Sequence, residues 1–246
     1  MTELCRIALA GASGKMGQAI ARLAQADSRV ALCDVHTRDA AALFAGADVV
    51  IDFSRPELTV TLAHEAARTG KALVSGTTGL DSAAMALLAD ASKHAPILWS
   101  ANMSVGVNLL AALVTQAARA LDASTDIEIV EMHHRHKVDA PSGTALLLGH
   151  AAAEGRAVRL DDVAVRVRDG HTGAREEGSI GFATLRGGDV VGDHTVIFAS
   201  EGERVELTHK ASNRDVFAAG ALRAALWLKN KPHGFYTMRH VLGLSQ

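Results

Sequence analysis

The chain has 246 residues, a hydrophobic fraction of 48%, a charged fraction of 21% and a formal net charge of -2 at pH 7. This length predicts one large or two small domains with a sizeable core. The near-neutral charge argues against nucleic acid or an anionic membrane as the main partner.

Targeting and redox signals are those of a cytoplasmic protein. No apolar run approaches the roughly 18 residues that a membrane-spanning helix needs, and the N-terminus lacks the pattern of a secretory signal. The two cysteines, Cys5 and Cys33, lie in apolar, strand-like runs. We expect them to be buried free thiols of a reducing compartment.

The first hundred residues alternate short apolar runs with alanine-rich helical runs. Strands are expected at residues 6–10, 30–33, 49–53, 72–75 and 97–100. Helices are expected at residues 16–25, 56–69 and 82–94. Short, continuously apolar strands that alternate with helices predict an α/β fold with a parallel sheet covered on both faces.

A glycine-rich segment follows the first strand and opens the first helix. It reads Gly11-Ala12-Ser13-Gly14-Lys15-Met16-Gly17, with the spacing G-x-x-G-x-x-G. Glycines at such a junction allow a tight turn and a close approach of the backbone to a pyrophosphate, and the helix start supplies amide donors. An ordinary structural turn is the alternative, but the position in a βαβ unit favours dinucleotide binding.

In such folds, residues at the end of the second strand bind the adenosine ribose of the cofactor. Asp34 would accept a hydrogen bond from the ribose 2′-hydroxyl and favour NAD. Arg38, helped by Lys15, would bind a 2′-phosphate and favour NADP. The sequence leaves the choice open and is compatible with both NADH and NADPH.

Two later segments also fall at the carboxyl ends of expected parallel strands, where ligands bind in such sheets. They are Gly76-Thr77-Thr78-Gly79 and Ser100-Ala101-Asn102-Met103. Small and hydroxyl-bearing residues there let a flat ring approach backbone groups, although ordinary turns use the same residues.

The pattern changes after residue 104. Helices are expected at residues 105–121, 142–153 and 215–228, and strands at residues 126–132, 163–168, 180–185, 190–199 and 204–210. Strands in succession with few helices predict an α+β region with a mostly antiparallel sheet.

The segment from Glu131 to Lys137 carries the densest chemistry. It places three histidines, an arginine and a lysine within five positions at the end of an expected strand. Imidazoles can transfer protons near neutral pH, and the local charge attracts a small anion. Strand alternation would put His133 on one face with Arg135 and Lys137, and His134 on the other with His136.

Three interpretations of this segment compete. One is a solvated basic loop. Another is a metal site with His134 and His136 as ligands, which the charges of Arg135 and Lys137 oppose. The third, which we favour, is an anion site with acid–base groups. The run Ser142-Gly143-Thr144 supports it, because amides at a helix start together with two hydroxyls form a carboxylate receptor. We therefore expect a small dicarboxylate beside a proton donor, and no metal.

The run E-x-H-H-R-H-K-x-D-A-P-S-G-T-A at residues 131–145 resembles the signature of the 4-hydroxy-tetrahydrodipicolinate reductase family, also called dihydrodipicolinate reductases. The resemblance covers essentially the whole chain. It includes the glycine motif and residues 51–56, 76–79, 101–108, 170–173 and 206–211.

The resemblance implies a fold, an assembly and an activity. Residues 1–104 and 214–246 would form a Rossmann-like NAD(P)-binding domain. Residues 105–213 would form an inserted α+β domain that binds substrate and builds a homotetramer. The implied activity is the NADH- or NADPH-dependent reduction of 4-hydroxy-tetrahydrodipicolinate to tetrahydrodipicolinate with loss of water, in the diaminopimelate route to L-lysine.

The resemblance also implies residue roles. His133 would be the general acid and base, and Lys137 a second proton donor. The substrate would be held by His134, Gly143 and Thr144, and we expect Ser142 to bind it as well, as part of the carboxylate receptor described above. The cofactor would be lined by Gly11, Ala12, Ser13, Gly14, Lys15, Met16, Gly76, Thr77, Thr78, Ser100, Ala101, Asn102 and Met103. Arg135 and His136 receive no role.

The chain departs from the family pattern between the second and third strands, where residues 37–48 replace a segment that is longer in many relatives. An ungapped match puts Thr37 at the position of the usual acidic ribose partner, with Arg38 next to it. A small gap would use Asp34 instead. The cofactor preference therefore stays open.

Two other classes of protein fit the N-terminal half. One is a different dehydrogenase acting on an amino acid, such as an aspartate or homoserine type, and the other is a non-catalytic NAD(P)-binding sensor. Neither gives a reason for His133-His134 beside Ser142-Gly143-Thr144.

Overall fold

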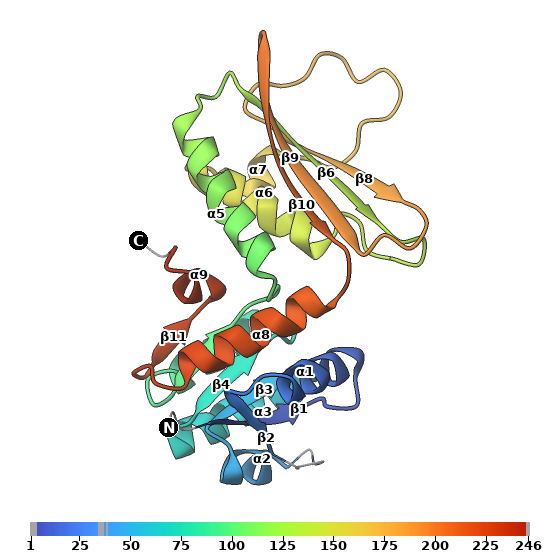
Figure 1. The fold of residues 1–246 in the computed structure, drawn as a ribbon. Coiled ribbons are helices and arrows are strands. Elements are labelled where there is room, and N and C mark those ends of the chain that lie inside the picture. The colour runs from blue at the N-terminus through green and yellow to red at the C-terminus, as the bar shows by residue number, and fades with distance from the viewer. Residues whose placement is uncertain (1–3, 34–36, 38, 245–246) are drawn as a thin grey trace. The chain divides into compact units, whose positions relative to one another are not determined.

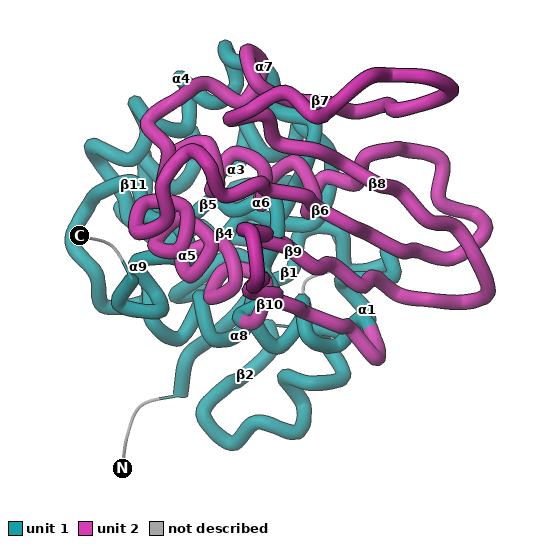
Figure 2. The backbone as a smooth tube through the Cα atoms, turned by 90° about the horizontal axis from the view of Figure 1, so that it is seen from above, with its two compact units in different colours: residues 1–105, 214–246 teal, residues 106–213 magenta. Residues whose placement is uncertain are grey.

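The computed structural model describes residues 4–33, 37 and 39–244, and the chain divides into two units. Unit 1 comprises residues 1–105 and 214–246, and unit 2 comprises residues 106–213 (Figure 2). Each unit has its own sheet and its own hydrophobic core.

Unit 1 has, within the described residues, a six-stranded parallel sheet in the order β11-β5-β4-β3-β1-β2. Its strands are β1 (Cys5–Ala10), β2 (Val30–Leu32), β3 (Val49–Asp52), β4 (Ala72–Ser75), β5 (Pro96–Trp99) and β11 (Gly234–Tyr236). Every residue of β3 and β4 is buried, which explains why both strands are apolar up to their last residues, Asp52 and Ser75. The predicted Rossmann-like sheet is confirmed.

Helices cover both faces of this sheet (Figure 1). One layer contains α1 (Lys15–Gln25), α8 (Asp215–Leu228) and α9 (Met238–Val241), and the other contains α2 (Ala40–Gly46), α3 (Pro56–Thr69) and α4 (Ser82–Ala91). A Cβ on Gly220 of α8 would lie 1.8 Å from the carbonyl oxygen of Met103. The glycine therefore lets α8 pack directly against the segment that follows β5.

The expected elements of unit 1 are confirmed, with ends that differ by up to three residues. Sequence patterning missed α2, β11 and α9. These elements are short, and β11 has only half-buried residues. A few residues of mixed burial give too weak a periodic signal to assign.

Unit 2 has a second sheet in the order β10-β9-β6-β8-β7. Its strands are β6 (Asp126–His133), β7 (Ala164–Val165), β8 (Ile180–Arg186), β9 (Gly192–Ser200) and β10 (Glu203–Ala211). Strand β9 runs antiparallel to β10 and β6, whereas β8 runs parallel to β6 and β7. The predicted α+β architecture with a mostly antiparallel sheet is confirmed.

Helices cover one face of the second sheet. They are α5 (Val105–Ala120), α6 (Gly143–Gly155) and the short α7 (Leu160–Val163). Buried and half-buried residues alternate along β6, and Ile127 and Ile129 belong to the core that these helices share. By the same alternation, Glu131 and His133 point to the helix-covered face.

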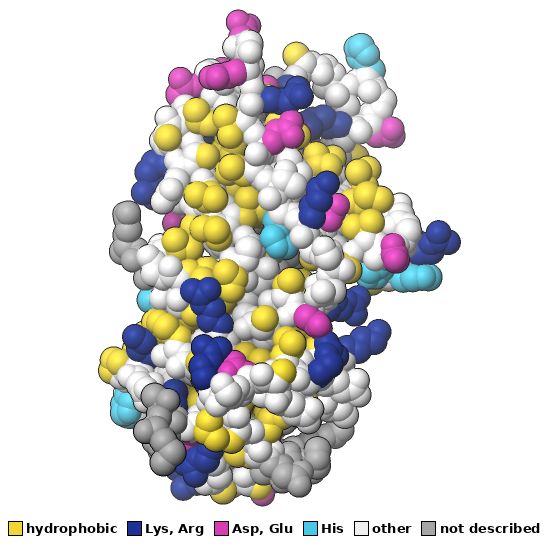
Figure 3. All heavy atoms as spheres, in the orientation of Figure 1, with side chains coloured by type: hydrophobic (Ala, Val, Ile, Leu, Met, Phe, Trp, Pro, Cys, Tyr) yellow, Lys and Arg dark blue, Asp and Glu magenta, His cyan; other side chains and the backbone are white. Residues whose placement is uncertain are grey.

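The opposite face of this sheet presents apolar side chains to the surface. Val130, Met132 and Ile197 are half-buried, and Leu185 is 49% exposed. Figure 3 shows apolar side chains gathered over these strands. A sheet with one such face is suited to contact another protein surface.

The strand expected at residues 163–168 is wrong for most of its length. Val163 ends α7, and only Ala164 and Val165 pair with β8. Val167 is 78% exposed, and Arg168 leaves the sheet to pair with Glu128. The alternating valines resemble a strand, but the sheet offers them no further partner.

The two cysteines are free, as predicted; Cys5 is buried and Cys33 is half-buried. Among the residues with described structure, no helix is long and apolar enough to cross a membrane.

Candidate active site

The loop between β1 and α1 approaches neighbouring backbone more closely than a side chain would allow. A Cβ on Gly11, whose φ is +82°, would lie 2.5 Å from the carbonyl oxygen of Phe53, and one on Gly17 would lie 2.3 Å from that of Gly11. The N-cap residue Gly14 has no side chain to cap the helix. The amides at the start of α1 therefore fit an anionic group such as a pyrophosphate.

Asp52, the last residue of β3, is a fully buried carboxylate at the same edge of the sheet. Its Oδ1 accepts hydrogen bonds from the amide and hydroxyl of Ser54, at 3.0 and 2.5 Å. Its Oδ2 accepts from the hydroxyls of Thr59, Ser75 and Thr77, at 2.6, 2.9 and 3.0 Å. The carboxylate thus ties the loop after β3, helix α3 and the loop after β4 together.

The loops after β4 and β5 are fixed by local contacts. A Cβ on Gly76 would lie 2.4 Å from the ring of Phe53, so this loop packs directly on the aromatic ring. The indole of Trp99 donates to the carbonyl oxygen of Thr77 at 3.0 Å. The hydroxyl of Ser100 donates to the carbonyl oxygen of Asn102 at 2.7 Å. These contacts give both loops defined shapes.

Parallel pairing places the expected cofactor segments at one edge of the unit 1 sheet. Residues 11–16, 76–78 and 100–103 follow the carboxyl ends of β1, β4 and β5. The two candidate ribose residues, Asp34 and Arg38, lie outside the described residues.

Glu131 is the centre of the site in unit 2. Its buried carboxylate accepts two hydrogen bonds from the guanidinium of Arg186, at 2.9 and 3.0 Å, and one from the amide of Ser142 at 3.1 Å. The Nδ1 of His133 lies 2.5 Å from its Oε2. Burial acts to raise the pKa of Glu131, but hydrogen bonds from Arg186 and His133 outweigh it and hold the pKa below its usual range.

His133, the last residue of β6, is almost completely buried. Because Nδ1 is bound to Glu131, Nε2 is the ring nitrogen that remains for a ligand. A Cβ on Gly192 would lie 2.9 Å from Nε2, so the ring lies directly against the backbone of β9. A carboxylate at one imidazole nitrogen stabilises the protonated ring and orients it, as in catalytic triads.

Ser142 is the N-cap of α6. Its Oγ accepts from the amide of Ala145 at 3.1 Å and lies 3.0 Å from Nε2 of His194, while its own amide donates to Glu131. These polar groups therefore anchor the start of the helix to the sheet. Gly143 and Thr144 follow as the first two residues of α6, at the positive end of the helix dipole.

The chain turns after His133, so strand alternation ends there. The Nζ of Lys137 pairs with Asp139 at 2.8 Å, and Arg186 donates to the carbonyl oxygen of Asp139 at 2.6 Å. The same guanidinium thus fixes both Glu131 and this loop. The rings of His134 and His136 lie 6.2 Å apart, and Arg135 is exposed.

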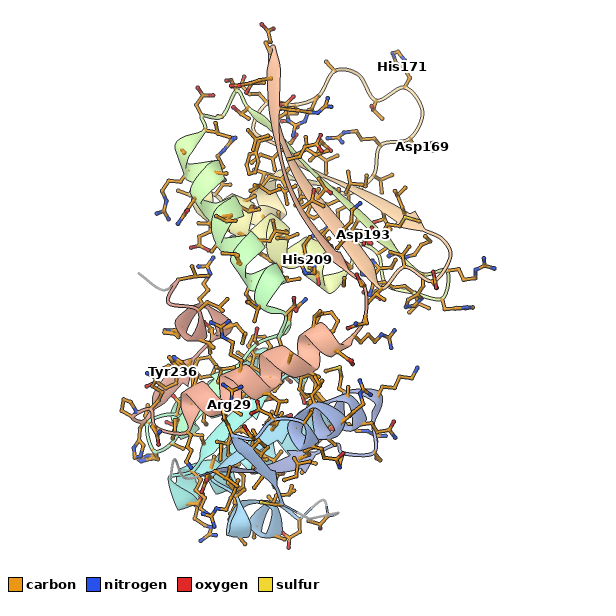
Figure 4. All side chains as sticks on the ribbon, viewed as in Figure 1. Arg29, Asp169, His171, Asp193, His209 and Tyr236 are labelled. Atoms are coloured by element: carbon orange, nitrogen blue, oxygen red, sulfur yellow. The ribbon has the colours of Figure 1, made fainter. Side chains whose placement is uncertain are left out.

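His194 of β9 completes the site and was not expected from the sequence. Its ring lies edge-on to that of His133, with centroids 5.0 Å apart. Burial and the neighbouring His133 lower the pKa of His194 to about 4, so it is neutral near pH 7. Figure 4 labels its chain neighbour Asp193 and its cross-strand partner His209 on β10.

Sequence reasoning overlooked Glu131, Arg186, His194 and Asp52 as parts of the sites. Strand alternation contained a signal for Glu131, because residues i and i+2 share a face and His133 lies two positions later. Arg186 and His194 could not be found this way. They join the site because β6 pairs His133 with Arg186 and Glu131 with His194.

Among the described side chains, no group of three or more His, Cys, Asp or Glu residues is arranged to hold a metal ion.

Three features define a nucleotide-dependent oxidoreductase: the parallel sheet, the start of α1 that follows the glycine-rich loop, and the buried imidazole–carboxylate pair. Two family models match the chain: Dihydrodipicolinate reductase, N-terminus, at residues 5–103, and Dihydrodipicolinate reductase, C-terminus, at residues 106–242. The chain belongs to the dihydrodipicolinate reductase family, and its cofactor is a pyridine nucleotide.

Individual relatives agree with this assignment. The 4-hydroxy-tetrahydrodipicolinate reductase of Agrobacterium fabrum is 51% identical, covering 98% of this chain and 97% of that protein. The enzyme of the same name from Chelativorans is 58% identical, covering 88% and 77%. The structure of dipicolinate-bound dihydrodipicolinate reductase from Paenisporosarcina has a TM-score of 0.77 at 21% identity, covering 95% and 97%, and supports the fold.

The Asp52 network gives a prediction for stability. Asp52→Ala removes an acceptor from four hydroxyls and one amide, of which the Thr59 hydroxyl keeps the carbonyl oxygen of Arg55 and the Ser54 amide keeps Oγ1 of Thr77. We expect the free energy of unfolding to fall by roughly 3 kcal/mol. Asp90→Ala is the control, because that carboxylate forms an exposed ion pair with Lys93 and should matter little. Urea denaturation measures both, and equal stability of the two variants would contradict the role of Asp52.

Proposed function

We propose that this chain reduces 4-hydroxy-tetrahydrodipicolinate to tetrahydrodipicolinate with loss of water, in the diaminopimelate route to L-lysine. The observation that carries the proposal is the Glu131–His133 pair, anchored through Ser142 to the start of α6. This contact supports the proposal, because it connects an imidazole, a side chain able to donate a proton, to a helix start suited to a carboxylate.

His133 supplies the proton in this proposal. Loss of water, with the hydroxyl leaving C4 and a hydrogen leaving C3, converts the substrate into the unsaturated ring of dihydrodipicolinate. When bound, the reduced nicotinamide would supply a hydride to C4 of that ring. The resulting enamine needs a proton, and the imidazolium of His133 donates it from Nε2. General acid catalysis of this kind contributes about 10²- to 10⁴-fold in rate.

The substrate carboxylates are assigned to the surrounding positive groups. We assign one to Gly143 and Thr144 in the first turn of α6, where the helix dipole is positive. Lys137 neutralises a carboxylate and acts as a second proton donor, and His134 contacts the substrate. The present partner of Lys137, Asp139, is 55% exposed, so a substrate carboxylate can replace it at modest cost.

We assign cofactor binding and substrate binding to different units. Residues 1–104 and 214–246 bind NADH or NADPH, and residues 105–213 bind the substrate. In support, the start of α1, capped by Gly14, lies in unit 1, and the Glu131–His133 pair lies in unit 2. The cytoplasm is the proposed location, supported by the two free thiols.

A coupled assay tests the activity. NADPH or NADH is incubated with the protein and the condensation product of pyruvate and aspartate semialdehyde, and the nicotinamide absorbance should fall. An unchanged absorbance would favour an NAD(P)-binding sensor, and turnover only with an amino acid and an oxidised cofactor would favour another dehydrogenase.

Substitution of the proton donor gives the sharpest kinetic test. His133→Gln should lower kcat about 10²-fold with little change in the cofactor KM, because only the proton-transfer step is affected. Lys137→Ala should impair both kcat and the substrate KM. Arg135→Ala, in the same loop but exposed, is the control and should keep normal values. A near-normal kcat for His133→Gln would remove His133 from this role.

Cofactor use gives a separate prediction. We expect activity with both NADH and NADPH. Arg38→Ala should raise the KM for NADPH about tenfold, because a charge-assisted hydrogen bond to the 2′-phosphate is lost, and should spare NADH. Asp34→Ala should do the reverse. Initial rates with each cofactor decide, and an unchanged KM in both variants would place ribose recognition elsewhere.

The oligomeric state gives a further prediction. We propose a homotetramer formed through the apolar face of the unit 2 sheet. Leu185→Asp should dissociate it, because a carboxylate would be buried among apolar side chains. Val158→Asp is the control, since Val158 is similarly exposed, at 43% against 49%, but lies after α6. Sedimentation velocity measures the assembly, and an intact tetramer of Leu185→Asp would exclude this interface.

A further inference from the structure

We propose that Glu131 is a positioning residue that fixes the hydrogen of His133 on Nδ1, so that the proton on Nε2 is the one that ionises. The proposal rests on the proposed function of His133 as proton donor. It adds a residue that acts through His133 without touching the substrate.

The geometry of the pair determines which nitrogen carries the hydrogen. The Nδ1 of His133 lies 2.5 Å from Oε2 of Glu131. An ionised carboxylate only accepts hydrogen bonds, so Nδ1 must donate in both the neutral and the protonated ring. Loss of the Nε2 proton then leaves a stable neutral imidazole. The opposite tautomer would hold its hydrogen on Nε2, where it is not acidic near neutral pH.

Arg186 keeps the carboxylate ionised throughout the cycle. It contacts both oxygens of Glu131 and is itself fixed to the carbonyl oxygens of Leu185 and Asp139. Breaking such a buried pair would leave an uncompensated charge, so the arrangement resists proton uptake by Glu131.

Glu131 also connects the proton donor to the substrate-binding helix start. The contacts form a closed ring: Glu131 holds His133 and the amide of Ser142, the Oγ of Ser142 lies at hydrogen-bond distance from His194, and His194 packs edge-on against His133. Movement of the carboxylate would therefore displace the imidazole and the first turn of α6 together.

The effect of Glu131 on His133 should be visible in the pH dependence of kcat, because Glu131 contacts the ring directly. The titratable and charged groups around this site are Glu131 on β6, Arg186 on β8, His194 on β9, His209 on β10, and Lys137 and Asp139 in the loop after β6. Of these, Glu131 is the anion in direct contact with the imidazole.

A purely structural carboxylate offers a matched comparison on the same strand. Glu128 is bound by Arg168 at 2.9 and 2.8 Å and by Arg175 at 3.0 Å, but it lies on the opposite face of β6. Glu128→Gln therefore disturbs an arginine–carboxylate pair in β6 without contacting His133.

The experiment compares the pH profiles of kcat for the wild type, Glu131→Gln and Glu128→Gln. The wild-type kcat should fall as pH rises and Nε2 loses its proton. Glu131→Gln should lower kcat about 10²-fold, because an amide donating to Nδ1 would favour the Nε2–H tautomer. In the pH profile of this variant, the fall in kcat should begin at lower pH, because the protonated His133 ring no longer has the Glu131 carboxylate beside it. In Glu128→Gln, kcat should fall over the same pH range as in the wild type.

The double variant separates positioning from independent effects. Adding Glu131→Gln to His133→Gln should change kcat by less than about threefold, because the two residues act as one unit. If His133→Gln alone kept normal activity, the proposed function would fail. If His133→Gln were impaired but Glu131→Gln kept the wild-type kcat and pH profile, only the positioning role would be overturned.

Nitrogen NMR of the wild type tests the tautomer even if Glu131→Gln does not fold. The ¹⁵N shifts of the His133 ring, assigned by comparison with His133→Gln, should show hydrogen on Nδ1 in the neutral form. Hydrogen on Nε2 in that form would overturn the proposal.

Discussion

The site in unit 2 depends on one buried charge, the carboxylate of Glu131. Removing a carboxylate from water costs several kcal/mol unless hydrogen bonds and an opposite charge compensate. The compensating groups come from the end of β8, the end of β6 and the start of α6. Satisfying this charge therefore requires three chain segments to meet at one point, and this brings the imidazole of His133 close to the positive end of the α6 dipole.

Unit 1 also buries a carboxylate, but there no cationic side chain among the described residues compensates its charge. Asp52 is fully buried, and its hydrogen-bond partners are the hydroxyls of four residues and one backbone amide. Hydroxyls satisfy a carboxylate locally while adding no positive charge to the sheet edge. The positive potential there then comes from the start of α1, which suits a pyrophosphate. Two buried carboxylates thus organise two loop clusters by different chemistry.

Much of the fold could be predicted from the sequence, because buried parallel strands such as β3 and β4 are apolar up to their last residue and α1 has a clear periodic pattern of apolar residues. Short elements such as β11 and α9 could not, since their burial depends on tertiary contacts. The residues of the site also differ in how far the sequence predicts them. His133 lies in a dense local motif, whereas Arg186 and His194 reach it only through the pairing of β6 with β8 and β9.

The two helix starts show how capping prepares different anion sites. Gly14 caps α1 with backbone alone, so side chains do not compete with a ligand for the amides of that first turn. Ser142 caps α6 and takes the amide of Ala145, while its own amide is held by Glu131. A diphosphate presents many oxygens and benefits from an uncapped turn. The start of α6 is instead held rigidly, because its cap residue is bonded to Glu131, which also contacts His133.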